Sequence, residues 1–353
     1  RILSCKPDVV SMSIVYNSQA FFSLALAKAL KQEGVEVVVG GPSVTPQLAD
    51  AALHLPHEAA LLDHLAGKKN DMRSLDCKRI LDYSSCKAED YATPELVIPL
   101  RTTSCCHYQQ CAFCTHHKHG TYEEYDLEDL KESIIASNAK LVFIVDDMIH
   151  KQRLLQLSET LKPLNVKWMC QLKPTKDLDT KTLKTLYDSG LRVTLWGLES
   201  GNDRILRLMR KGTNTRDIAA VLKDSKEAGM TNVVYTLLGF PTETEEEFLD
   251  TIAFLKDHKD HIDLVSTTVF GLQEGAPVAE HPEEYGIITI QRTKRKALPD
   301  KLSYEVMEGL HADDAKLLRK KYMKTIQSIN TYPREMNIYR EHMLYITAHL
   351  KTS

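Results

Sequence analysis

The sequence lacks any apolar run long enough to cross a bilayer, and it has no pattern of a secretory signal peptide. It also lacks a strong net charge: the formal value is −3, so bulk electrostatics gives no reason to expect a nucleic acid or a membrane as partner. Its eight cysteines are unevenly spread, unlike the disulfide framework of a secreted domain. These absences predict a folded protein of the reducing cytoplasm.

The size and composition are those of a folded α/β protein. At 353 residues, with 43% hydrophobic and 26% charged residues, the chain suits one large barrel or two to three domains. It opens with Arg1 rather than methionine, in the middle of an α/β pattern. We therefore expect further residues to precede it and to complete the first domain.

Half of the cysteines lie in ten residues, Cys105 to Cys114, after a strand-like apolar run at 96–100. Within this stretch Cys106, Cys111 and Cys114 offer three thiolates from one loop, which indicates a metal site. A four-iron, four-sulfur cluster normally takes four cysteines, so three would leave one iron open to a small chelating molecule. The alternative is structural zinc, held by three cysteines and one histidine, which would be one of His116, His117 and His119.

The first 65 residues predict a Rossmann-like half-domain. Strands are expected at 8–13 and 35–39, and helical structure at 18–34 and at 48–65, the latter with a break around Pro56. Such a pattern implies parallel strands with a right-handed crossover. Ligands bind beyond the carboxyl ends of such strands, so we expect a crevice lined by Ser11, Ser13, Gly40 and Gly41.

From residue 96 the pattern alternates strand and helix six times. The expected strands are 96–102, 141–145, 166–172, 192–197, 232–238 and 264–270. The expected helices are 127–138, 152–161, 180–189, 203–209 with 215–228, and 245–258. This predicts an α/β fold with a partial (β/α)6 TIM-like barrel whose chemistry lies at the carboxyl ends of the strands. The expected divisions are a half-domain at 1–68, a connector at 69–95, the barrel at 96–285 and a helical C-terminal region at 286–353.

The cysteine loop and four later motifs resemble the radical S-adenosylmethionine (SAM) superfamily, in the branch that carries a cobalamin-binding domain. The motifs are Phe-Ile-Val-Asp-Asp at 143–147, Trp-Gly-Leu-Glu-Ser-Gly at 196–201, Leu-Gly-Phe-Pro-Thr-Glu-Thr at 238–244 and Phe-Gly-Leu-Gln-Glu-Gly at 270–275. Two departures stand out, since the first cysteine gap is four residues rather than three and Thr242 replaces a glycine. Thr102-Thr103-Ser104-Cys105-Cys106 aligns best with Cys106 as the first ligand, and Cys105 is the alternative.

The resemblance implies cofactors and the residues that hold them. It assigns a [4Fe-4S] cluster to Cys106, Cys111 and Cys114. It assigns SAM to four residues: Phe113 against the adenine, with Glu199, Ser200 and Gln171. It also implies cobalamin at Ser11, Ser13, Gly40 and Gly41. Asp146 and Asp147 either cap the helix that follows or contact substrate or cofactor, which makes them weak candidates for a catalytic role.

The function implied is a radical SAM enzyme that forms a 5′-deoxyadenosyl radical and methylates an unactivated carbon of a small molecule or peptide. The implied partner is a one-electron reductant of flavodoxin or ferredoxin type. One alternative is a non-methylating radical SAM enzyme with a vestigial cobalamin domain. Another, of a different class, is a zinc-stabilised Cys3His binding module without catalysis. The sequence names neither the substrate nor the oligomeric state.

Overall fold

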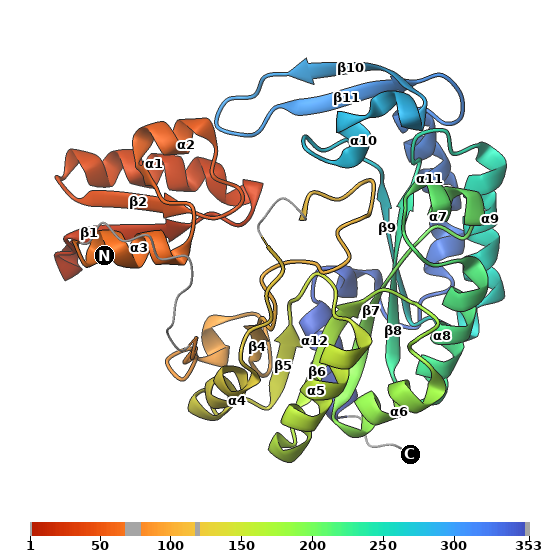
Figure 1. The fold of residues 1–353 in the computed structure, drawn as a ribbon, viewed down its shortest axis with the longest axis horizontal. Helices are drawn as coiled ribbons and strands as arrows, with labels where there is room; N and C mark the ends of the chain where they lie inside the picture. The colour runs from red at the N-terminus through yellow and green to blue at the C-terminus, as the bar shows by residue number, and fades with distance from the viewer. Residues whose placement is uncertain (1, 68–78, 117–120, 350–353) are drawn as a thin grey trace. The chain divides into compact units, whose positions relative to one another are not determined.

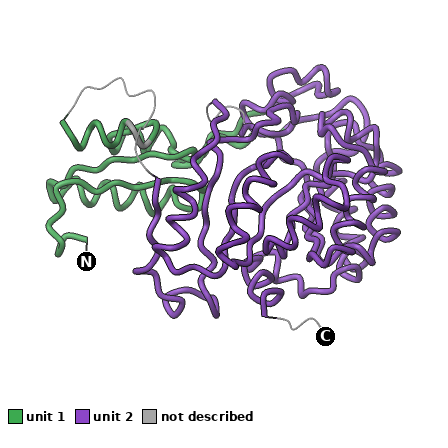
Figure 2. The backbone as a smooth tube through the Cα atoms, turned by 60° about the horizontal axis from the view of Figure 1, so that its bottom comes forward, with its two compact units in different colours: residues 1–78, 291–303 green, residues 79–290, 304–353 purple. Residues whose placement is uncertain are grey.

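A computed structural model of the chain describes residues 2–67, 79–116 and 121–349 (Figure 1). Their contacts divide the chain into two compact units (Figure 2). Unit 1 comprises residues 1–78 and 291–303, and unit 2 comprises 79–290 and 304–353. After residue 290 the chain thus leaves unit 2, contributes thirteen residues to unit 1, and returns to unit 2 at residue 304.

Unit 1 is built on a parallel sheet of three strands in chain order. Its elements are β1 (Val9–Ser13), α1 (Ala20–Gln32), β2 (Glu36–Gly40), α2 (Pro46–Ala51), β3 (Leu53–His54) and α3 (Glu58–Leu65). The predicted strands and first helix are confirmed. The helical stretch expected over 48–65 is broken before Pro56, as predicted, and the break contains the short strand β3. Leu55 donates its amide to Val39 at 2.9 Å, and the following Pro56 disfavours helical backbone at Leu55.

Unit 2 contains a parallel sheet of six strands that also run in chain order (Figure 1). The strands are β4 (Val97–Leu100), β5 (Leu141–Ile144), β6 (Lys167–Leu172), β7 (Leu191–Glu199), β8 (Thr231–Leu238) and β9 (Leu264–Val269). The helices between them are α4 (Leu127–Ala136), α5 (Lys151–Leu161), α6 (Thr180–Asp188), α7 (Asp203–Leu208), α8 (Thr215–Glu227) and α9 (Glu245–Asp257). The predicted βα order is confirmed. In the part of the chain that the structure describes, the sheet is open, with β4 and β9 at its two edges.

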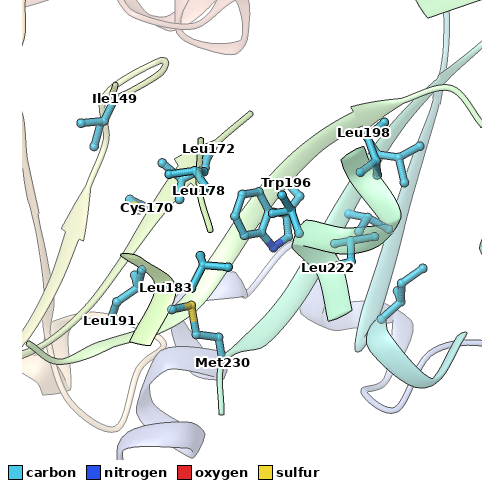
Figure 3. Close-up of a cluster of buried hydrophobic side chains, with 14 of the residues drawn as sticks. Ile149, Cys170, Leu172, Leu178, Leu183, Leu191, Trp196, Leu198, Leu222 and Met230 are labelled. Atoms are coloured by element: carbon cyan, nitrogen blue, oxygen red, sulfur yellow. The ribbon is translucent and has the colours of Figure 1, made fainter. Parts of the chain in front are cut away.

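Apolar side chains cover both faces of this sheet, as expected for parallel strands. On one face Trp196, Cys170 and Leu172 pack with residues of the surrounding helices (Figure 3). Successive side chains alternate between faces, so Met169 lies on the other face, where it packs with Met343 of α12 (Arg340–His349). The C-terminal helix therefore seals the second face, a question that the sequence left open.

The region after residue 286 begins with a strand pair rather than with helices, so the expectation of a wholly helical region is corrected. The elements there are β10 (Ile287–Thr293), β11 (Lys301–Val306), α11 (Ala312–Gln327) and α12. The Ile and Thr residues at 287–290 are β-branched and favour strand. Within the segment 291–303, Leu298 packs against the unit 1 cluster that contains Ile14 and Val39.

Short helices complete the description. They are α10 (Pro277–Glu280) and the 3-10 helices η1 (Leu3–Cys5), η2 (Asn17–Gln19), η3 (Ala88–Asp90), η5 (Lys162–Leu164), η6 (Lys259–His261), η7 (Pro282–Tyr285) and η8 (Arg334–Asn337). Among the described residues, no helix combines the length and apolar character needed to cross a membrane.

Candidate functional site

The cysteine loop leaves the carboxyl end of β4 and is fixed at its middle by two backbone hydrogen bonds. Ala112, which is fully buried, donates its amide to Met209 at 2.9 Å and accepts from the amide of Val278 at 3.0 Å. Cys114 donates to the carbonyl of Cys111 at 3.2 Å, which makes a tight turn between these two residues. The loop thus has a defined shape over the carboxyl end of the sheet.

A buried carboxylate holds the start of the loop. Asp146, at the end of β5, accepts from the amides of Thr102 at 2.8 Å and Thr103 at 3.3 Å, and from the Thr102 hydroxyl. The buried Arg153 donates to the Thr102 carbonyl at 3.0 Å and to that of Tyr125. The side chain of Asp146 therefore has its hydrogen-bonding capacity engaged by the loop, which is the role of a positioning residue.

The thiols of the loop fall into two classes. Cys105 is 1% exposed, like a core residue, and accepts a hydrogen bond from Gln109 Nε2 at 3.4 Å. Cys106, Cys111 and Cys114 are half-buried free thiols. Burial raises the pKa of Cys114 to about 11, with smaller upward contributions from the Cys111 and Cys106 sulfurs. Cys106 is half-buried like Cys111 and Cys114, whereas Cys105 lies in the core, which favours Cys106 over Cys105 as the first ligand.

This donor set is suited to an iron–sulfur cluster, which is held by cysteine thiolates. Within the described ranges, no three histidine, cysteine, aspartate or glutamate side chains are gathered so as to hold one metal ion. A four-iron cluster makes a different demand, because each thiolate binds its own iron. Of the three histidines in the zinc hypothesis, His117 and His119 lie outside the described residues.

A buried ion pair lies next to the thiols. Lys211 Nζ donates to Glu199 Oε1 at 2.8 Å, and both side chains are almost inaccessible. Burial by itself lowers the pKa of Lys211. The Glu199 carboxylate and, after it, the Cys111 thiol raise this pKa, and the net shift is upward. Gly197 leaves room for this pair, because a Cβ there would stand 2.7 Å from Lys211 Nζ. The site thus places a carboxylate and an ammonium group beside Cys111.

A second lysine is held by an aromatic ring of the loop. Lys173, just after β6, places its Nζ 3.2 Å from the centre of the Tyr108 ring. Burial lowers its pKa to about 8, against an upward contribution from Cys111. Tyr108 in turn donates its hydroxyl to the Arg210 carbonyl at 2.9 Å. Both lysines therefore bring positive charge towards the thiols, which stabilises thiolates.

Asp147 has a different environment from Asp146. Its Oδ1 lies 2.6 Å from His116 Nδ1, and its Oδ2 lies 3.9 Å from an Arg101 guanidinium nitrogen. The hydrogen bond to Asp147 raises the pKa of His116. The two aspartates, which the sequence treats alike, therefore have separate roles: one is a buried support and the other is a half-exposed partner of a loop histidine.

The other residues predicted to hold SAM are only partly brought together. Phe113 has its ring centre 5.7 Å from Lys211 Nζ, beside Glu199. Ser200 is fully buried, and its hydroxyl is 3.2 Å from the Thr251 hydroxyl, so its side chain is engaged with α9. Gln171 is exposed on β6. The structure supports Phe113 and Glu199 as neighbours and gives Ser200 a structural partner.

The motif at 238–244 forms a tight turn, and its backbone conformation shows why a glycine is usual at the position that Thr242 occupies here. Thr242, which replaces a glycine, has φ +67°, in the left-handed region that favours glycine. Arg204 supports this backbone by donating to the Thr242 carbonyl at 2.7 Å. The next residue, Glu243, is fully buried; it accepts from the Gly239 amide, and its Oε1 has no partner in the described part of the chain.

The four residues predicted to contact cobalamin lie together in unit 1. Ser13 pairs with Gly40 across β1 and β2, and Ser11 lies two residues earlier on the same side of β1. Ser11 and Ser13 are exposed. Gly41 has φ +103°, and a Cβ there would stand 2.6 Å from the Ile14 carbonyl oxygen, so only glycine fits this approach.

Two residues of the site, Tyr108 and Lys211, were not singled out by sequence reasoning. Tyr108 lies inside the cysteine loop, and its aromatic character beside a thiolate cluster was an available signal. Lys211 precedes a glycine in an exposed-looking basic stretch, and only the fold brings it to Glu199. Lys173 follows β6, and the fold brings its ammonium group onto the Tyr108 ring.

Comparison with known proteins agrees with this arrangement. Residues 100–255 match the family model described as the radical SAM superfamily. An uncharacterized methyltransferase of Pyrococcus horikoshii is 25% identical over 90% of this chain and 78% of its own length. A ribosomal protein uS12 methylthiotransferase, RimO, of Caldicellulosiruptor saccharolyticus is 24% identical over 64% of this chain and 55% of its own length.

Two solved structures share the fold. The cobalamin-dependent SAM radical enzyme OxsB, with aqua-cobalamin and SAM bound, superposes with a TM-score of 0.67 at 16% identity, covering 98% of this chain and 64% of OxsB. The radical SAM methyltransferase TsrM from Kitasatospora setae, with tryptophan and a SAM analogue, gives 0.64 at 13% identity, covering 93% of this chain and 79% of TsrM. The chain thus spans less than two thirds of OxsB and of RimO.

Proposed function

We propose that the chain, whose residues 100–255 match the radical SAM superfamily, is a cobalamin-dependent methyltransferase of this superfamily. Cys106, Cys111 and Cys114 would hold a [4Fe-4S] cluster. The observation that carries the proposal is the set of three half-buried free thiols on one loop at the carboxyl end of a parallel sheet. When bound, the cluster supplies the electron that cleaves SAM, and methylcobalamin supplies a methyl group.

The residues around the thiols have roles that their chemistry suggests. Glu199 presents a carboxylate that suits the ammonium group of SAM, and Lys211 holds this carboxylate in place. Phe113 offers an aromatic face beside them for the adenine. The buried environment of this pair strengthens its electrostatic interactions with a ligand.

Unit 1 supports the cobalamin part of the proposal. OxsB and TsrM, whose folds the chain shares, are described with cobalamin. In this chain Ser11 and Ser13 present exposed hydroxyls on β1, and Gly40 and Gly41 lie at the carboxyl end of the neighbouring strand β2. Ligands of such sheets bind at this edge.

A second candidate is methylthio transfer, favoured by the sequence likeness to RimO. The substrate of either reaction would be a small molecule or a peptide, and the enzyme would need a one-electron reductant. The two candidates differ in their product, since only methylthio transfer adds sulfur.

The testing experiment is metal analysis and turnover of protein purified without oxygen and supplied with cobalamin. We expect about four irons and stoichiometric cobalt per chain, with formation of 5′-deoxyadenosine from SAM. Iron without cobalt would contradict the cobalamin step and leave a radical SAM enzyme of another kind. Zinc alone, in a colourless protein that never forms 5′-deoxyadenosine, would contradict the proposed function altogether.

A further inference from the structure

The first residue of α12 places an arginine side chain on the second face of the unit 2 sheet. Further along the helix, Met343 and Leu344 are fully buried in a cluster with apolar side chains of the strands β5 to β9. Arg340 begins the helix and donates to the hydroxyl of Tyr235 on β8. Its guanidinium carbon lies 5.5 Å from the centre of the Tyr235 ring. The packing of α12 therefore holds a guanidinium group against this face.

Tyr235 lies beside two of the proposed SAM residues, on the same face of the sheet. It pairs in register with Gly197 of the neighbouring strand β7. A Cβ on Gly197 would stand 2.7 Å from Lys211 Nζ and 2.8 Å from Glu199 Oε1, so that ion pair lies over the same face. Burial raises the pKa of Tyr235, and the Glu199 carboxylate adds to this shift. The arginine on Tyr235 is therefore a neighbour of the proposed SAM site without being part of it.

Polar side chains accompany Tyr235 on this face. Ser266 pairs with Tyr235 across β8 and β9. Thr268, two residues further along β9, lies on the same side and is exposed. On β6, Gln171 is exposed two residues after the buried Met169. Hydroxyl and amide groups can donate and accept hydrogen bonds, so this part of the face offers contacts to a polar ligand.

Arg340 has hydrogen-bonding capacity that the protein does not use. A guanidinium group has five N–H donors, and within the described ranges the polar partner of this side chain is the neutral Tyr235 phenol, with no carboxylate. By contrast, Arg204 of the same unit is paired with Glu247. The planar fork of an arginine matches the oxygens of a carboxylate or a phosphate. The remaining donors of Arg340 therefore suit an oxyanion.

We propose that Arg340 binds a carboxylate or phosphate group of the substrate, which makes the substrate an anionic compound. The inference rests on the proposed function, because it takes Glu199 and Lys211 as part of the SAM site. Arg340 is then a specificity-determining residue. Its ion pair with the substrate fixes the anionic end on α12, and the rest of the substrate lies along the polar face towards SAM.

The test uses the full chain, loaded with iron, kept oxidised and supplied with SAM. The probes are phenyl phosphate and phenylacetate, with benzyl alcohol as the neutral reference, and ligand-observed NMR measures their binding. In Arg340→Gln we expect the Kd of the better-bound anion to rise about tenfold or more. Arg340→Lys keeps the charge but loses the planar fork, so it should recover part of the affinity. Which anion binds the wild type more tightly assigns the substrate group as phosphate or carboxylate.

Arg319→Gln is the matched control. Arg319 of α11 also donates to a hydroxyl of the sheet, that of Thr267 at 2.8 Å. Thr267 follows Ser266 on β9 and therefore points to the opposite face. This variant should bind both anions as the wild type does. Iron content and the binding of benzyl alcohol and SAM should be the same in wild type, Arg340→Gln and Arg319→Gln.

Three results would overturn the inference. One is a wild-type protein that binds neither anion. Another is an equal Kd for the anions in wild type and Arg340→Gln, which would leave Arg340 as an anchor of α12 on Tyr235 even if the variant were less stable. The third is loss of SAM binding in Arg340→Gln with unchanged anion binding, which would place Arg340 in the SAM site. Failure of the proposed function would be seen separately, as wild-type protein that contains no iron.

Discussion

We expect Asp146→Ala to lower the free energy of unfolding by roughly 3 to 5 kcal/mol, because it removes the acceptor of three buried donors. Asp146 accepts from the Thr102 and Thr103 amides at 2.8 and 3.3 Å and from the Thr102 hydroxyl. Asp146, Thr102 and Thr103 are each at most 1% exposed, so water cannot replace the lost acceptor. A hydrogen bond to a charged group contributes about 1.5–3 kcal/mol, and two such bonds with one long bond give this total.

The assay is urea unfolding of the apoprotein, followed by circular dichroism, together with the iron content of protein reconstituted without oxygen. Iron content should fall along with stability, because the hydrogen-bonded residues Thr102 and Thr103 lead directly into the cysteine loop. Asp146→Asn should lie between wild type and Asp146→Ala. Its amide oxygen can still accept from one backbone donor, but its NH2 group cannot accept from the others.

The neighbouring Asp147→Asn is the control. The Asp147 side chain is 24% exposed and pairs with the half-exposed His116, and such surface pairs contribute about 0–1 kcal/mol. We expect little loss of stability and a lower pKa of His116, since Asp147 raises it. Equal losses in both variants would refute this reasoning. A stable, iron-loaded Asp146→Ala protein without turnover would show instead that Asp146 is a catalytic residue.

Three further predictions follow from individual side chains. Cys106→Ala should abolish iron binding whereas Cys105→Ala should retain it, and the reverse result in iron analysis would move the first ligand by one residue. Burial raises the pKa of Glu243 to about 8 from an ordinary value of 4.5. The contribution of this one group to stability is therefore fully present below its ordinary pKa and falls by up to about 1.4 kcal/mol per pH unit as the pH rises towards its folded value. Glu243→Gln should remove this dependence in urea titrations, and an unchanged slope would contradict the assignment. Gly197→Ala should displace Lys211 by its added Cβ and weaken SAM binding about tenfold or more in equilibrium dialysis, while unchanged binding would exclude the ion pair from the SAM site.

Some of the structure follows from local sequence alone. The six strands of unit 2 and their helices were predictable because the helices have their own apolar periodicity and N-terminal capping residues, and α6 and α8 stop at Gly190 and Gly229. The cysteine loop was predictable because its three candidate ligands lie within nine residues, so no fold is needed to bring them together. The hairpin β10–β11 was missed, although its β-branched run at 287–290 carried a strand signal.

Other features depend on contacts between residues far apart in the chain. Adjacent Asp146 and Asp147 look equivalent in sequence, yet one is buried against Thr102 and the other faces His116. Lys211 meets Glu199 only because the chain after β7 folds back over the strand end. Periodicity and spacing report what a segment prefers by itself, whereas burial and partner choice arise when separate segments pack. The sequence by itself therefore determined the fold class and the candidate ligands, and only the tertiary structure decided which charged groups surround them.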